Sequence, residues 1–242
     1  MLLSATVLGF SVYLLLWLFL VYSFLGVLIE GFFCLVTDGV LQLRLGLLYL
    51  PLRPLYGIGG VASTVLCYRF LPEPIVVFGL GMLVCSVVEF FDHWLFEKAF
   101  GAVSWDYSDK PLHLQGRICL QYSACWGLLA LAALYGLDQV LGGSLAPAAG
   151  PLAQALLTAC LVLLLLSLVL TVAVLAGVRR RIDLRRAQAR GEKASSSRAQ
   201  DSLVERLVPD RVIIHSFPHL SLTRELEQAT AGVPGRGASV RR

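Results

Sequence analysis

The stretch LAQALLTACLVLLLLSLVLTVAVLAGV, residues 152–178, decides the fold class, because its 27 residues contain no charged side chain. A helix rises about 1.5 Å per residue, so a hydrocarbon core of roughly 30 Å is crossed by about 20 apolar residues. The stretch therefore predicts a membrane-spanning helix. Arg179, Arg180 and Arg181 follow it directly, and cations in that position are typical of the cytoplasmic end of a span.

Further apolar runs precede this stretch, and together they predict a membrane protein. The chain is 57% hydrophobic and only 15% charged, whereas soluble domains contain about 25% charged residues. The predicted fold class is all-α, a polytopic membrane helix bundle. We expect about five transmembrane helices, at residues 7–29, 55–71, 74–96, 118–141 and 152–178.

The charges divide the chain into two parts. Of the 20 Lys and Arg residues, 14 lie after residue 178, and no charged side chain precedes Glu30. We therefore expect a transmembrane domain at residues 1–178 and a basic, partly disordered cytoplasmic tail at 179–242. Loops 37–54 and 97–117 carry cations and loops 71–74 and 142–151 carry none, which favours an outside N-terminus and a cytoplasmic C-terminus.

Two carboxylates, Glu30 and Glu89, lie within or beside apolar runs. A charge in the membrane costs a few kcal/mol, so such a group faces protein or water and has a partner. Asp92 and His93 follow Glu89 at i+3 and i+4 and share its helix face. Two interpretations stay open. The four groups line an ion or substrate path, or the two glutamates pair with loop cations and pin the loops, the candidates being Arg44, Arg53 and Arg117.

Two connections are unusually rich in polar, aromatic and glycine residues, and the topology puts both on the cytoplasmic side. PLRPLYGIGG, residues 51–60, is too irregular for a continuous helix, so we expect a re-entrant or interfacial turn. WDYSDKPLHLQGR, residues 105–117, contains more polar and aromatic residues than a plain interfacial loop explains. The candidate loop residues are Pro51, Pro54, Tyr56, Gly57, Gly59, Trp105, Asp106, Tyr107, Ser108, His113, Gly116 and Arg117.

Known chemical motifs are missing from the sequence. No spacing suggests a catalytic pair or a metal site, and the six cysteines form no CxxC and suit small packing residues. GxxxxGK[ST] does not occur, so the chain has no P-loop with which to hydrolyse ATP. We expect no enzyme activity, no metal and no cofactor. The basic tail is expected to contact anionic lipid and not nucleic acid.

Five segments nevertheless form a pattern in chain order: YSFLGVLIE (22–30), PLRPLYGIG (51–59), Glu89, WDYSDKPLHLQGRICL (105–120) and CWG (125–127). Over residues 14–140 the chain resembles the CmpB-like family of bacterial membrane proteins, the type IV ABC-transporter permeases. The fifth expected span and the arginine-rich tail lie outside that block. Val27 stands where the family tends to have Trp, and His113 stands where it has a characteristic Asn.

This resemblance implies a permease subunit in the bacterial plasma membrane that relies on an ATP-binding subunit supplied in trans. The 97–117 loop is then the expected docking element for that subunit. The alternative is a non-transporting scaffold or regulator that recruits a partner at its cytoplasmic loops. Five spans form only a small bundle, so we also expect a homo-oligomer or a larger complex. No residue pattern indicates the substrate.

Overall fold

The computed structural model describes residues 5–43, 46–140, 150–189, 213, 217 and 220–222. Helices dominate, which confirms the all-α prediction. Two small antiparallel hairpins accompany them. The helices are α1 (Val12–Asp38), α2 (Pro54–Cys67), α3 (Pro74–Phe100), α4 (Leu120–Ala132) and α6 (Pro151–Ala189), with a 3₁₀ turn at Tyr68–Phe70 and a π turn at Ala133–Leu137; the strands are β1 (Thr6–Val7), β2 (Phe10–Ser11), β3 (His113–Leu114) and β4 (Ile118–Cys119).

Among the described residues, four helical stretches are long and apolar enough to span a membrane, and they are Val12–Thr37, Pro74–Phe100, Leu120–Val140 and Pro151–Asp183. The second of the five expected spans is not among them. Helix α2 has 14 residues, which gives about 21 Å of helix against a hydrocarbon core of roughly 30 Å. The expectation of a transmembrane helix at residues 55–71 is therefore not met by a helix of full spanning length.

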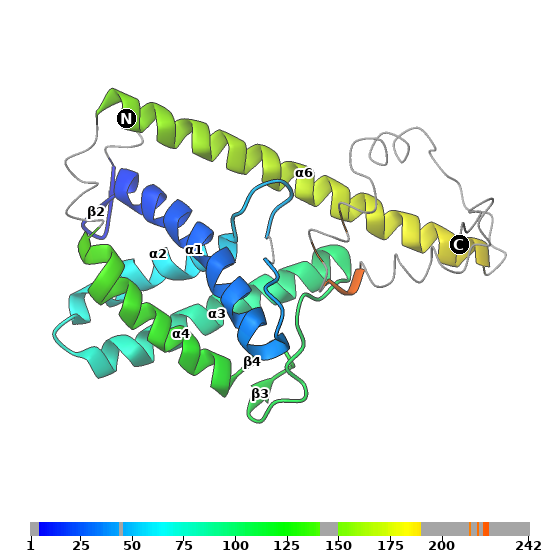
Figure 1. Cartoon of the computed structure of the whole chain (residues 1–242), viewed down its shortest axis with the longest axis horizontal. Coiled ribbons are helices and arrows are strands. Elements are labelled where there is room, and N and C mark those ends of the chain that lie inside the picture. Colours follow the sequence, from blue (N-terminus) through cyan, green and yellow to red (C-terminus); the bar gives the residue numbers. More distant parts are fainter. Residues whose placement is uncertain are drawn as a thin grey trace.

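The helices nevertheless alternate in direction through the bundle (Figure 1). Helix α2 runs back along α1, α3 and α4 follow in opposite directions, and the long α6 runs beside the group and extends past it. The helices α1, α2, α3, α4 and α6 therefore run alternately in opposite directions, and α2 is the short one among them. The end of α1, the start of α2, the end of α3 and the β3–β4 hairpin all lie at one end of the bundle (Figure 1).

Local signals set the limits of α1. Ser11 caps its start by accepting a hydrogen bond from the backbone N–H of Leu14 at 3.2 Å, and Gly39 ends it in the left-handed conformation. The helix therefore begins later than the expected residue 7 and ends well beyond residue 29. As a consequence, Glu30 lies inside a membrane helix and not at its edge.

Helix α2 also differs from expectation at its start. Pro54 occupies the first turn, where the missing N–H and fixed φ of proline are favourable. The residues from Pro54 to Gly60 are therefore helical, and the predicted irregular turn is confined to the segment before Pro54. Gly57 permits a very close approach of α1, because a Cβ there would lie 2.2 Å from Ser23 Oγ. Close approach of helices through small residues is typical of membrane proteins.

The loop before α2 reaches α6 through its backbone. Leu48 is fully buried, its N–H donates to Thr171 Oγ1 at 2.9 Å, and its carbonyl accepts from Ser167 Oγ at 2.5 Å. These bonds satisfy non-helical backbone inside the protein, as a membrane environment requires. Leu48 belongs to an apolar cluster that also includes residues of α6, the end of α3 and four described tail residues, Ile213, Phe217, Leu220 and Leu222.

Candidate functional site

Glu30 is held by two side chains from the region where α2 begins. Arg53 Nη2 lies 3.4 Å from Glu30 Oε1, and the Tyr56 hydroxyl donates to the same oxygen at 3.2 Å. Both members of the ion pair are largely buried. Burial works against the charge of Arg53, but the Glu30 carboxylate and Tyr56 outweigh it and hold the pKa of Arg53 above its usual value. The Arg53 guanidinium therefore stays charged beside Glu30.

Glu89, on α3, is held in a different way. Its side chain is only 3% exposed. Trp126 Nε1 donates to Oε2 at 3.0 Å, and the Tyr107 hydroxyl donates to Oε1 at 3.2 Å. Burial and the Glu89 charge raise the pKa of Tyr107, so the phenol keeps its proton and remains a donor. Within the described part of the chain, no Lys or Arg forms an ion pair with Glu89.

The two glutamates belong to one arrangement, which we call the acid cluster: Arg53, Glu30, Tyr56, Trp126, Glu89 and Tyr107. The connection runs through aromatic rings, because the Tyr56 and Trp126 rings lie 4.8 Å apart between centroids. Four segments of the chain contribute to the cluster, namely α1, the start of α2, α3 with the following loop, and α4. The expected pairing with Arg53 therefore occurs for Glu30, whereas Glu89 is bound by neutral donors.

The other two candidate cations lie elsewhere. Arg117 Nη2 pairs with Glu97 Oε2 at 2.7 Å and its guanidinium lies 5.1 Å from the Phe90 ring centroid. Arg44 lies outside the described residues. Asp92, half-buried on the face of Glu89, lies within range of the Arg53 charge. The site therefore combines the candidates Glu30, Glu89 and Asp92 with a cation that comes from the loop before α2.

The loop at residues 101–119 positions the Tyr107 hydroxyl against Glu89 through bonds within the loop. Asp106 accepts from the backbone N–H of Ser108 at 2.9 Å and from its hydroxyl at 2.6 Å, and these bonds lower the pKa of Asp106. The Tyr107 N–H donates to the carbonyl of Gly116 at 2.8 Å. Gly116 has φ +70°, and a Cβ there would lie 2.6 Å from both Asp106 Oδ1 and Ser108 Oγ.

The remaining loop candidates support this geometry. Trp105 Nε1 donates to the carbonyl of Arg117 at 2.9 Å, and His93 Nε2 lies 3.2 Å from the carbonyl of Trp105. His93 is thereby tied to the loop as a structural histidine would be. His113 lies on β3, exposed, and its Nδ1 accepts from the N–H of Gly116 at 3.1 Å. Pro51 lies exposed in the loop before α2, and Gly59 is buried within α2.

A second buried acid, Asp138, was missed by the sequence reasoning. It is 7% exposed, it accepts from Thr64 Oγ1 at 2.7 Å on Oδ2, and the Tyr22 hydroxyl donates to Oδ1. The available signal was an acid that follows the apolar run of α4 without a break. Asp138, Tyr22 and Thr64 thus join the end of the fourth span to α1 and α2. On α1, Tyr22 lies more than two helical turns from Glu30.

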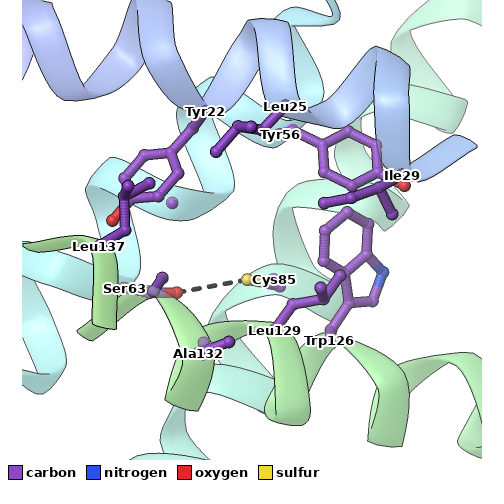
Figure 2. A pocket seen from close by; sticks show the side chains of 13 residues that line it. Tyr22, Leu25, Ile29, Tyr56, Ser63, Cys85, Trp126, Leu129, Ala132 and Leu137 are labelled. Atoms are coloured by element: carbon purple, nitrogen blue, oxygen red, sulfur yellow. Dashed lines mark hydrogen bonds between the residues drawn. The ribbon is translucent and has the colours of Figure 1, made fainter. Parts of the chain in front are cut away.

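An apolar cavity of about 190 Å³ lies between the acid cluster and Asp138. Figure 2 shows Tyr22 and Leu137 at one end of it and Tyr56, Ile29 and Trp126 at the other. The full lining is Tyr22, Leu25, Ile29, Tyr56, Gly60, Ser63, Cys85, Trp126, Leu129, Ala130, Ala132, Ala133 and Leu137. Among the residues that the structure describes, no group of three or more His, Cys, Asp or Glu is placed to hold a metal ion.

A family model described as "Putative ABC-transporter type IV" matches residues 17–172. The match extends beyond the expected block of 14–140 and covers most of α6, so the expectation that the last span lies outside the family pattern is wrong. No curated protein and no solved structure matches the chain.

Proposed function

The chain belongs to the ABC-transporter type IV family, and we propose that it is a permease subunit whose ATPase is a separate chain. The observation that carries the proposal is the acid cluster. Ionisable groups inside membrane helices are costly and face functional paths or partners. Glu89 is 3% exposed and bound only by uncharged donors among the described residues, an arrangement that a purely structural ion pair does not need.

The charge balance of the acid cluster supports a role in moving a cation or proton. Two carboxylates, Glu30 and Glu89, stand against one guanidinium, that of Arg53. A cluster with this composition gains from one further positive charge, because opposite charges attract more strongly in a low-dielectric interior than in water. The donors on Glu89, a phenol and an indole, hold the carboxylate without neutralising it. The carboxyl group of Glu89 therefore remains available to a passing cation or proton.

The proposed docking element for the ATPase is the β3–β4 hairpin. Leu112 and Leu114 are 75% and 54% exposed, and the hairpin stands at one end of the bundle (Figure 1). Exposed apolar side chains on a polar loop are typical of interaction sites. A partner bound there would lie next to Tyr107, which the same loop positions on Glu89. Movement of the hairpin on nucleotide binding or hydrolysis by the partner would thus shift Tyr107 relative to Glu89 and so change the acid cluster.

We place the protein in the bacterial plasma membrane with its C-terminus in the cytoplasm. The arginines at the end of α6 support this orientation by the positive-inside rule. The end of α6 and the hairpin lie toward the same end of the bundle (Figure 1), so the docking element would also be cytoplasmic. The small bundle further leads us to propose that the working permease contains more than one copy of this chain.

Affinity purification of the full chain from detergent-solubilised membranes tests the proposal. We expect an ATP-binding subunit to co-purify, and the double variant Leu112→Asp with Leu114→Asp to lose it. Leu8→Asp is the matched control, since Leu8 is 73% exposed in the β1–β2 turn, distant in the fold from the hairpin. Recovery of a partner without ATPase activity would favour the scaffold alternative, for which the same exposed hairpin is the supporting observation.

A further inference from the structure

We infer that the cavity between α1 and α4 binds one hydrocarbon chain. It is walled by Tyr22, Leu25 and Ile29 of α1 on one side and by α4 with the π turn on the other, with Ser63 and Cys85 at its floor (Figure 2). This inference concerns binding alone, so it stands whether or not the chain is a permease.

The polar groups of the lining are already engaged. The hydroxyl of Tyr22 donates to Asp138 and that of Tyr56 donates to Glu30. Trp126 Nε1 donates to Glu89. At the floor, Ser63 Oγ and Cys85 Sγ lie 3.3 Å apart and bond each other (Figure 2). The cavity therefore offers an occupant apolar surface, and a polar ligand would lose its hydration without regaining hydrogen bonds.

The volume of the cavity limits the size of the apolar molecule that it can hold. An engineered cavity of about 150 Å³ lined by apolar side chains stays dry and takes up benzene, and the cavity here is slightly larger, at about 190 Å³. Sites for whole drug-sized ligands are larger, roughly 300–1,000 Å³. A single chain segment fits this range, whereas a complete double-chain lipid does not.

The surroundings indicate how such a chain enters. The cavity is partly open, and its lining comes from α1 to α4 and the π turn without a contribution from α6. Helix α1 packs on α2, α2 on α3, and α3 on α4, so the described residues leave the side between α1 and α4 least closed. Phe24 and Leu28 on α1 and Leu128 on α4 are exposed. In a membrane these side chains contact acyl chains, so the occupant enters sideways from the bilayer.

Occupancy would be coupled to the acid cluster through shared residues. Tyr56 and Trp126 form one end of the cavity, and the same two side chains hold Glu30 and Glu89. A chain in the cavity therefore presses against the rings that position both carboxylates. The bound hydrocarbon chain can come from two sources with the same chemistry: a lipid of the bilayer, or the tail of a single-chain amphiphile.

Photo-crosslinking of the full chain in lipid nanodiscs, without any ATPase, tests the inference. The probe is a phosphatidylcholine that carries a diazirine on one acyl chain, and labelled residues are mapped by mass spectrometry. We expect labels on Leu25 and Leu129, which line the cavity, above the level on Leu163, an exposed residue of α6. Displacement of these labels by an excess of a free fatty acid would identify a single-chain amphiphile as the occupant; persistence would identify a bilayer lipid.

Ala132→Phe provides the decisive variant, because Ala132 lines the cavity and is itself exposed, so the new ring has room to cover the opening. We expect cavity labelling to fall at least about tenfold, since the loss of roughly two buried methylene contacts has that effect on affinity. Ala155→Phe on α6, also exposed, is the matched control and should label as the parent does. Size-exclusion profiles verify folding. If Ala132→Phe aggregates, Leu129→Trp replaces it, and labelling is then read at Leu25 alone.

Uniform labelling of all lipid-facing positions, unchanged in the variant, would overturn the inference. That result would leave the permease proposal intact, because co-purification of the ATPase is measured separately. Conversely, specific cavity labelling in a chain that recovers no ATPase would reject the permease and retain the binding site.

Discussion

Tyr56 and Trp126 lie with their ring centroids 4.8 Å apart, and each donates a hydrogen bond to a different carboxylate. This contact joins Glu30 on α1 to Glu89 on α3, although neither acid bonds the other. The rings also close one end of the apolar cavity. The relationship between these two side chains therefore links the charged and the apolar parts of the site, and it leads to several predictions.

Trp126→Phe should destabilise the protein by about 1–3 kcal/mol, because it leaves the buried Glu89 Oε2 without its donor. The phenyl ring retains most of the packing against Tyr56. Combination with Tyr56→Phe should be non-additive by about 0.5–3 kcal/mol, as for residues in contact. Denaturation of the purified variants in detergent measures both values. Additive effects would show that the two halves of the acid cluster are independent.

Gly116→Ala should displace Tyr107 from Glu89. The position has φ +70°, and the new methyl group would meet Asp106 and Ser108 at 2.6 Å. We expect a loss of stability of at least about 1 kcal/mol from the left-handed conformation alone, with a change in near-ultraviolet signal from the loop aromatics. Gly136→Ala serves as the control, because a Cβ there meets nothing within 4 Å. Equal stability of the two variants would contradict this role of Gly116.

Tyr22→Phe should lower stability by about 1–3 kcal/mol, because Asp138 would keep only the Thr64 hydroxyl as a hydrogen-bond donor among the contacts described. Tyr68→Phe is the control: Tyr68 is 42% exposed and its ring packs on Phe10, a contact that phenylalanine preserves. Thermal unfolding in one detergent compares the two. A larger effect at Tyr68 would mean that Asp138 does not depend on Tyr22.

Cysteine labelling tests the orientation. In a cysteine-free background, Ser144→Cys, before α6, should react with an impermeant maleimide from outside intact cells. Ser196→Cys, after α6, should react only once the membrane is permeabilised, because the arginines that follow the last span favour the cytoplasm. The reverse pattern would reject the proposed orientation and with it the cytoplasmic position of the hairpin.

The sequence predicted the elements whose signal is local. Long apolar runs located the four helical stretches that can span a membrane. The signal failed where one residue type has two uses. Pro54 indicated a break in the chain but begins a helix, and the span expected to stop at residue 29, before Glu30, belongs to a helix that continues to residue 38.

The site required long-range information. That Arg53 pairs with Glu30, and that Trp126 and Tyr107 bind Glu89, depends on how four segments pack, which no periodicity encodes. Tertiary contacts also explain why Asp138 was missed. An acid at the end of an apolar run resembles an ordinary helix terminus until Tyr22 and Thr64 are brought to it from α1 and α2.

Glu89→Gln tests the central claim, that the buried acid serves function and not the fold alone. Glutamine keeps the shape but only one acceptor oxygen, so either the Trp126 indole or the Tyr107 hydroxyl loses its acceptor. We therefore expect stability to fall by about 1–3 kcal/mol while the folded protein stays in the membrane. The ATPase rate of the co-purified complex should fall strongly. Glu73→Gln, in an exposed position at the opposite end of the same helix, should leave that rate unchanged. Loss of folded Glu89→Gln protein from the membrane, or full activity in its presence, would contradict the account.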